Sequence, residues 1–241
     1  MVQEITAELA PTGVLRAGIN LSNFLLVTGK AANGDPQGVS PDMAAEIARR
    51  LGVPLKLVAY QTPALLADAV DNNEWDIGNI GAEPQRAEKI AFTAAYCEIQ
   101  STYLVPAGSK LKTIADVDQP GVRIAVADRT AYGLWLDRNI KHATLLKAEG
   151  LDGSYELFLK ESPDALAGLL PRLMSDVKKL PGARIIDGQF SAVQQAVGTR
   201  RNNSKAAKWL AAFVEEAKAS GFVQSLIDKH KVVGLSVAPS A

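Results

Sequence analysis

Several residue types that build functional sites are scarce in this chain. Cys97 is the only cysteine among 241 residues, so no internal disulfide or cysteine-based metal cluster can form, and we expect it to be a buried small residue rather than a reactive thiol. The only histidines, His142 and His230, are too few for a histidine-rich metal site and are expected at the surface. From these absences we expect neither a metal nor another cofactor.

An excess of one charge and a long apolar run are also missing. Lys and Arg total 26 and so do Asp and Glu, which argues against a nucleic-acid-binding surface. No window reaches the roughly 18 uninterrupted apolar residues of a membrane span. The start, MVQEITAELAPTG, lacks the basic region and apolar core of a secretory signal. We expect a soluble protein, which is periplasmic if a signal was trimmed from a precursor and cytoplasmic otherwise.

Strand and helix signals alternate in the first hundred residues. Residues 14–19, 53–58 and 76–80 read as strands. The first helix is expected to begin with Ser40 as its N-cap and to end at Gly52. A second helix opens at Thr62-Pro63, and its inner face is expected to consist of Leu65, Leu66, Ala69 and Val70. This order of elements predicts a mostly parallel sheet with helices on its faces.

A second series of elements predicts a second lobe. Residues 122–126 read as a strand, and Thr130 is a plausible N-cap for the helix that follows. Residues 97–106 and 191–198 read as extended crossings between the lobes, and a closing helix follows at 204–220. We therefore expect an α/β protein with residues 1–100 plus 191–241 in lobe 1 and residues 101–190 in lobe 2, each a mixed, mostly parallel sheet flanked by helices.

The segment WDIGNIGAEPQRAEKIAFTAAY, residues 75–96, predicts a place to hold a carboxylate. Gly81 and Ala82 permit close backbone approach, and Pro84 opens a helical turn from which Arg86 projects. Loops at the carboxyl ends of strands face the ligand crevice in open α/β proteins, and the planar fork of arginine matches a carboxylate. An ordinary surface ion pair of Arg86 with Glu83 or Glu88 is the alternative that spacing alone leaves open.

Motifs along nearly the whole chain match one protein family in order. They are LRAG at 15–18, GVSPDM at 38–43, LG at 51–52, WDI at 75–77 and RAEKIAFT at 86–93. The ordered set resembles the bacterial extracellular solute-binding proteins of family 3, which serve polar amino-acid ABC transporters. The resemblance implies a type II periplasmic-binding-protein clamshell that closes on a small ligand in the interlobe cleft, with Arg86 taking the carboxylate of that ligand.

The resemblance also implies further ligand contacts and shows where this chain departs from the family. The implied contacts are Asn20, Asn23, Phe24, Gly81, Ala82 and Glu83 in lobe 1, and Arg129, Thr130, Ala131 and Tyr132 in lobe 2. Asn20 stands where an aspartate is usual, and Leu169 falls near the position of the amine-binding aspartate of the family. An unpaired ammonium in a closed cleft would be costly. We therefore expect a small carboxylate-bearing ligand, an amino acid or a related organic acid.

Two other functions stay open at this point. The same clamshell resembles cyclohexadienyl and arogenate dehydratases, in which an acid transfers protons, and Glu83 would be that acid. A neighbouring Arg86 favours ionised Glu83, which is the wrong form for a general acid, and no nucleophile with an adjacent base is readable. The second alternative is a ligand-sensing domain. We expect a monomeric binding protein without catalytic residues, whose partner is an ABC-transporter permease.

Overall fold

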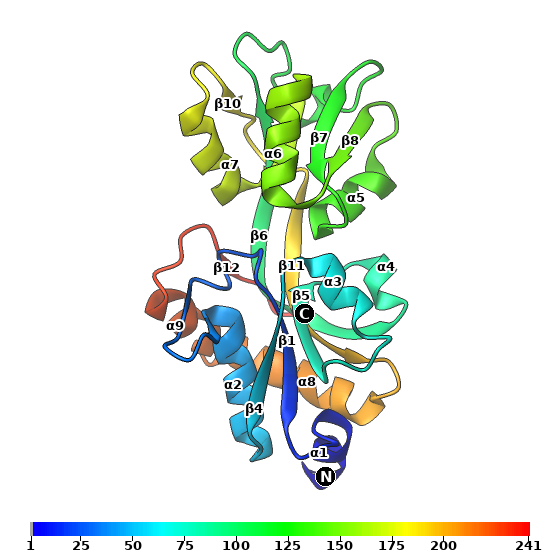
Figure 1. The fold of residues 1–241 in the computed structure, drawn as a ribbon, viewed down its shortest axis with the longest axis vertical. Helices are drawn as coiled ribbons and strands as arrows, with labels where there is room; N and C mark the ends of the chain where they lie inside the picture. Colours follow the sequence, from blue (N-terminus) through cyan, green and yellow to red (C-terminus); the bar gives the residue numbers. More distant parts are fainter. Residues whose placement is uncertain (1) are drawn as a thin grey trace. The chain divides into compact units, whose positions relative to one another are not determined.

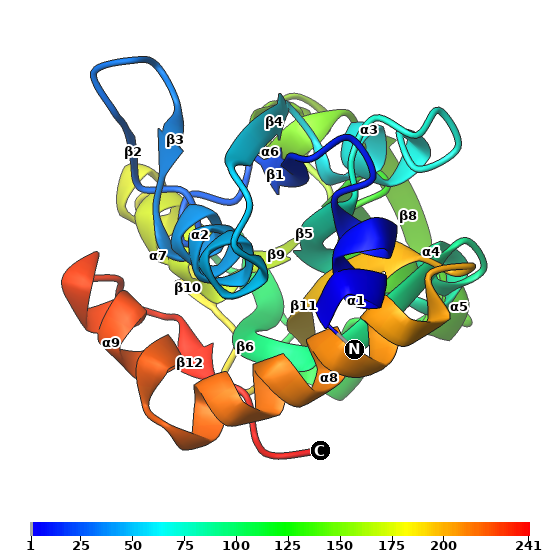
Figure 2. The ribbon, with the colours of Figure 1, turned by 90° about the horizontal axis from the view of Figure 1, so that it is seen from below.

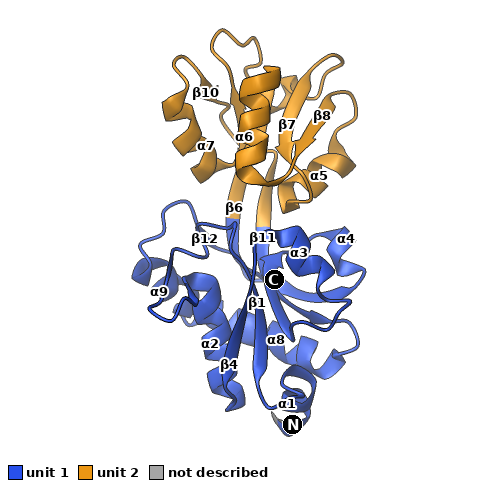
Figure 3. Ribbon diagram, in the orientation of Figure 1, with its two compact units in different colours: residues 1–98, 194–241 blue, residues 99–193 orange. Residues whose placement is uncertain are grey.

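The structure, a computed structural model, describes residues 2–241 and contains two compact units. Unit 1 comprises the residues up to Glu98 and those from Gln194 onward, and unit 2 comprises Ile99–Val193 (Figure 3). The chain passes from one unit to the other along two long strands, β6 (Ile90–Val105) and β11 (Ser191–Arg200). Both segments that the sequence predicts as extended crossings overlap these strands.

Unit 1 contains most of the elements (Figure 1). In chain order they are α1 (Val2–Leu9), β1 (Leu15–Asn20), β2 (Gly29–Lys30), β3 (Pro36–Gln37), α2 (Val39–Leu51), β4 (Leu55–Tyr60), α3 (Pro63–Asp68), β5 (Ile77–Gly81), α4 (Pro84–Ala87), α8 (Ser204–Ala219), α9 (Phe222–Lys229) and β12 (Ser236–Val237). Those of unit 2 are the 3-10 turn η1 (Ile114–Asp116), β7 (Arg123–Ala127), α5 (Ala131–Asn139), β8 (Thr144–Ala148), α6 (Gly150–Glu161), β9 (Ala165–Leu169), α7 (Leu170–Asp176), the 3-10 turn η2 (Val177–Lys179) and β10 (Arg184–Ile185).

The sheet of each unit brings the carboxyl ends of its parallel strands to one edge. In unit 1 the strand order is β4-β1-β5-β11-β6, with β1 parallel to β4 and β5, and β11 antiparallel to β5. In unit 2 the order is β6-β9-β7-β8, with β7 parallel to both its neighbours and β9 antiparallel to β6. The expected α/β class with mixed, mostly parallel sheets flanked by helices is confirmed.

The capping signals at Thr62 and Gly52 placed helix ends correctly, and the one at Ser40 did not. Thr62 caps α3 by accepting a hydrogen bond from Leu65 N at 3.3 Å, and Gly52 ends α2 in the left-handed conformation. The expected N-cap of α2 at Ser40 is wrong, because the helix begins at Val39 with Gly38 as its N-cap. Gly38 has φ 151°, and a Cβ there would lie 2.2 Å from Leu26 O. The close contact between Gly38 and the loop at Leu26 therefore fixes where α2 begins.

The core of unit 1 on the α3 side is built around Trp75. Its indole is fully buried and donates a hydrogen bond to Leu66 O at 2.9 Å. The residues packed with it are Leu66, Ala69, Val70, Ile80 and Ile90. Three of the four residues expected on the inner face of this helix are buried, but only Leu66 of these lies in α3, because Ala69 and Val70 follow its end at Asp68. Leu65 is 50% exposed. One helical position separates it from Leu66, and that step of about 100° turns it to solvent.

The amino-terminal helix of the described chain stabilises the start of a distant helix. Figure 2 shows α1 beside α8. Glu8 Oε2 accepts a hydrogen bond from Ala206 N at 2.8 Å, and Asn203 Nδ2 donates to Glu8 O at 3.2 Å. The glutamate therefore pairs with a free N–H of the first turn of α8, where a negative charge is favourable. The single closing helix expected at 204–220 is followed by a second helix, α9, after Gly221.

Candidate ligand-binding site

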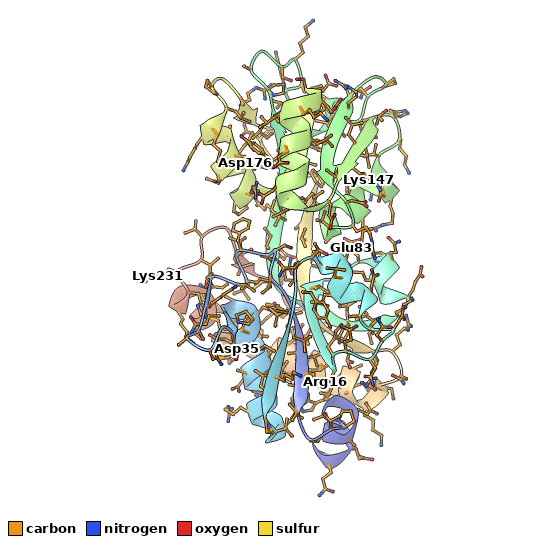
Figure 4. The ribbon with its side chains drawn as sticks, in the orientation of Figure 1. Arg16, Asp35, Glu83, Lys147, Asp176 and Lys231 are labelled. Atoms are coloured by element: carbon orange, nitrogen blue, oxygen red, sulfur yellow. The ribbon has the colours of Figure 1, made fainter. Side chains whose placement is uncertain are left out.

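The candidate site lies at the carboxyl edge of the strands of unit 1. Asn20, Tyr60 and Gly81 end the parallel strands β1, β4 and β5, so the loops that follow them lie at the same edge. Figure 4 labels Glu83 at this edge and Arg16 near the opposite end of β1. Ligands of open α/β sheets bind outside the carboxyl ends of the strands. The loop that carries Arg86 is therefore placed where a ligand is expected.

Arg86 is held in a defined position by the strand that precedes it. It belongs to the short helix α4, which Pro84 opens after Glu83 in the N-cap position. The side chain is buried, and its Nη1 donates a hydrogen bond to Gly81 O at 2.7 Å. A guanidinium has five N–H donors in a fixed planar fork, and the bond to this carbonyl orients the group. This arrangement presents a cation beside the end of β5.

The backbone around Gly81 and Ala82 is already partly engaged. Gly81 pairs with Gln195 in the β5–β11 ladder, and its carbonyl accepts the bond from Arg86. Ala82 N donates to Gln194 O at 2.7 Å. The backbone that lies close to these two residues is therefore that of strand β11. Any role of Ala82 toward a ligand must use a group other than its N–H.

The loop after β1 contains two structural asparagines followed by one accessible aromatic residue. Asn20 Oδ1 accepts hydrogen bonds from Ser22 N at 3.1 Å and from Ser22 Oγ at 2.7 Å. Asn23 is buried, and its Oδ1 accepts from Leu25 N at 3.2 Å and Leu26 N at 3.3 Å. Both amides thus act as turn-forming groups. Phe24 is 39% exposed and presents apolar surface at this edge.

The corresponding loop of unit 2 begins after β7. Thr130 caps α5: its hydroxyl donates to Ala127 O at 2.8 Å and accepts from Gly133 N at 3.1 Å. Arg129, just before it, has φ 53°, a left-handed conformation that is uncommon outside glycine. Ala131 is buried. The expected cap at Thr130 is confirmed, and the arginine is carried on a sharply turned backbone.

Tyr132 is an interior residue and not a surface for stacking. It is 2% exposed, and burial raises the pKa of its phenol above the ordinary value. A hydrogen bond with Thr130 and the charge of Arg172 oppose that rise in pKa, while the charge of Asp176 adds to it. The charges that act on this phenol belong to Arg172 and Asp176 on α7, a pair that the sequence predictions overlooked. The signal available for that pair was the i, i+4 spacing of Arg172 and Asp176.

The remaining reactive residue types have structural surroundings. Cys97 is fully buried, as expected, and burial raises the pKa of its thiol, which disfavours the reactive thiolate. Within residues 2–241, no group of three or more His, Cys, Asp or Glu side chains is placed to hold a metal ion. No helix in the same range is both long enough and apolar enough to cross a membrane.

Comparison with known structures identifies the fold. A cysteine-binding protein from Campylobacter jejuni has a TM-score of 0.73 at 19% identity, covering 95% of this chain and 92% of its own. An amino acid ABC transporter substrate-binding protein from Streptococcus pneumoniae, bound to L-arginine, has a TM-score of 0.72 at 20% identity. The match covers 98% of this chain and 99% of that protein. The ancestral amino acid-binding protein AncCDT-1, a precursor of cyclohexadienyl dehydratase, has a TM-score of 0.72 at 22% identity. The match covers 95% of this chain and 98% of that protein. The fold is that of type II periplasmic binding proteins.

Sequence comparison agrees with the family that the motifs resemble. No individually curated protein matches the chain. The family model of the bacterial extracellular solute-binding proteins, family 3, matches residues 20–232, which include the loops after β1 and β5. The chain therefore belongs to the bacterial extracellular solute-binding proteins of family 3.

Proposed function

We propose that this protein captures a small carboxylate-bearing solute, an amino acid or a related organic acid, for an ABC uptake transporter. The observation that carries the proposal is Arg86, a buried cation oriented by Gly81 O at the carboxyl edge of unit 1. Membership of family 3 and the structural likeness to amino-acid-binding proteins support it. Phe24 would supply apolar contact, and Arg129 and Thr130 are the proposed contacts in unit 2.

The identity of the solute can be obtained directly. Native mass spectrometry of freshly purified protein is expected to show a co-purified molecule that carries at least one carboxylate. A bound molecule without any acidic group would contradict the proposal. We further propose a periplasmic monomer whose partner is a transporter permease, on the strength of the family, which is described as extracellular.

The two crossing strands carry the second part of the proposal. Because β6 and β11 are the connections between the units, bending there would change how the units are oriented. Small-angle scattering with the molecule found by mass spectrometry is expected to show a smaller radius of gyration than without it. The Arg86→Ala variant in the same solutions is the control. An unchanged radius at saturation would contradict ligand-driven closure.

An enzymatic role is the second candidate, because one structural neighbour is a precursor of cyclohexadienyl dehydratase. Glu83 is the acid that would transfer a proton, since it directly precedes the helix of Arg86. Incubation with prephenate or arogenate, followed by chromatography, is expected to return the substrate unchanged from the wild type and from Glu83→Gln alike. Product that forms well above background and disappears in Glu83→Gln would establish the enzyme instead.

A further inference from the structure

The carboxyl edge of unit 2 contains a fixed cation that the proposed function does not yet use. Strands β7 and β9 are parallel neighbours, so Ala127 and Leu169, their last residues, end at the same edge. Arg172 follows the end of β9 by three residues on α7. Its charge and that of Asp176 act on the phenol of Tyr132, in the first turn of the helix after β7. Arg172 therefore lies near the ends of both strands.

The guanidinium of Arg172 is fixed from one side by a buried carboxylate. Its Nε donates to Asp176 Oδ2 at 2.8 Å, and the side chain of Asp176 is 1% exposed. The other oxygen of Asp176 accepts from Lys179 Nζ at 3.2 Å. Both oxygens of this acid are thus taken by cations of the protein. An ammonium group of a ligand would have to displace one of them to use Asp176.

The other side of Arg172 has only a weak partner. Its Nη2 donates to Asp152 Oδ1 at 2.8 Å, but the side chain of Asp152 is 87% exposed. Exposed ion pairs contribute only about 0–1 kcal/mol in general, so another anion can replace this one. Nη1 makes no hydrogen bond within the described residues 2–241. Two adjacent nitrogens of the guanidinium are therefore open to a carboxylate, the geometry of a bidentate pair.

The charges around Arg172 favour an incoming anion over a cation. Arg172 and Lys179 balance Asp176 and Asp152 while all four are paired. If Asp152 turns into solvent, one positive charge is left, and an anionic ligand group restores neutrality. Leu169 and Leu170, which connect β9 to this group, carry no acid. The exposed acid Glu149 follows β8. Strand β8 is separated from β9 by two strand spacings, about 9.5 Å.

We propose that Arg172 binds a second anionic group of the ligand at the carboxyl edge of unit 2. The substrate class is then a small dicarboxylate or a similar dianion, and recognition does not depend on an ammonium. This inference rests on the proposed function, because it assumes that the solute reaches this edge. Asp176 is a positioning residue that orients the guanidinium, and Asp152 is the exposed group that the ligand replaces.

Calorimetry with defined probes tests this inference. The probes are succinate, glutarate and adipate, with butyrate, valerate and hexanoate as their chain-matched monocarboxylates and L-glutamine as an ammonium-bearing acid. We expect at least one dicarboxylate to bind the wild type about tenfold or more tightly than its monocarboxylate match. A tenfold gain in affinity is the lower end of what a hydrogen bond to a charged group contributes. Arg172→Gln should remove that difference and leave monocarboxylate binding unchanged.

Asp152→Asn separates a ligand-binding role from a structural one. Because the side chain of Asp152 is 87% exposed, the variant should fold normally, and freeing Arg172 should tighten dicarboxylate binding severalfold. Glu161→Gln makes the same charge change at the far end of α6 and should have no effect. Unchanged dicarboxylate affinity in both Asp152→Asn and Arg172→Gln would overturn the inference.

The same titrations distinguish this inference from the proposed function. L-glutamine binding to the wild type, with dicarboxylates no tighter than monocarboxylates, would overturn the role of Arg172 and leave the proposed function standing. Probe binding that survives unchanged in Arg86→Ala would contradict the proposed function instead. Glu149→Gln should leave dicarboxylate binding unchanged; a loss of L-glutamine binding in that variant alone would assign an ammonium site to Glu149 and overturn the inference.

Discussion

Arg86→Ala is expected to weaken binding of the co-purified solute by about 10- to 100-fold, the range for a hydrogen-bonded ion pair shielded from water. The bond from Nη1 to Gly81 O orients the fork before any ligand arrives, so the loss should appear mainly as faster release. Isothermal calorimetry and stopped-flow dissociation measure the two quantities. Arg86→Lys should recover only part of the affinity, because an ammonium cannot form the paired bonds of a guanidinium.

The control for Arg86 is an arginine that carries the same charge away from the edge. Arg49 on α2 is 71% exposed and pairs with Glu46 at 2.7 Å. Arg49→Ala should bind the solute as the wild type does. Equal affinity in Arg86→Ala and the wild type, measured on protein shown to be folded, would remove Arg86 from the site.

Asp76→Ala is expected to lower the free energy of unfolding of unit 1 by about 3–5 kcal/mol, the usual result of removing one partner of a buried ion pair. The carboxylate of Asp76 is fully buried and accepts from Arg16 N at 2.9 Å, Arg16 Nε at 2.9 Å and Arg16 Nη2 at 2.7 Å. Arg200 Nη2 lies 3.9 Å from it. Without the carboxylate, the guanidinium groups of Arg16 and Arg200 lose the anion that both approach.

Chemical denaturation measures this loss, and a nearby aspartate provides the control. Asp71 forms an exposed ion pair with Lys89, so Asp71→Ala should cost no more than about 1 kcal/mol. Asp76→Asn keeps the volume of the side chain and isolates the effect of its charge. A loss in Asp76→Ala no larger than that in Asp71→Ala would show that the buried pair does not stabilise the fold.

The sequence predicted features whose causes lie within a few residues. A threonine hydroxyl reaches the N–H three positions on, so Thr62 and Thr130 could be recognised as caps from their immediate neighbours. The parallel sheets followed from the alternation of strand and helix signals. Ser40 failed as a cap because the competing start at Gly38 depends on a loop twelve residues earlier, which no local pattern reveals.

The sequence by itself determined the family, the α/β class and the position of the Arg86 loop after a strand. These features depend on the order of motifs and on short-range periodicity. Only the tertiary structure decided which polar groups are free to act. In the folded chain, Asn20 and Asn23 form hydrogen bonds within their own loop, and Tyr132 is buried. Asp152 pairs with Arg172, which lies twenty positions further along the chain. Hydrogen bonds between distant segments depend on packing in space, and a single sequence carries no local signal for them.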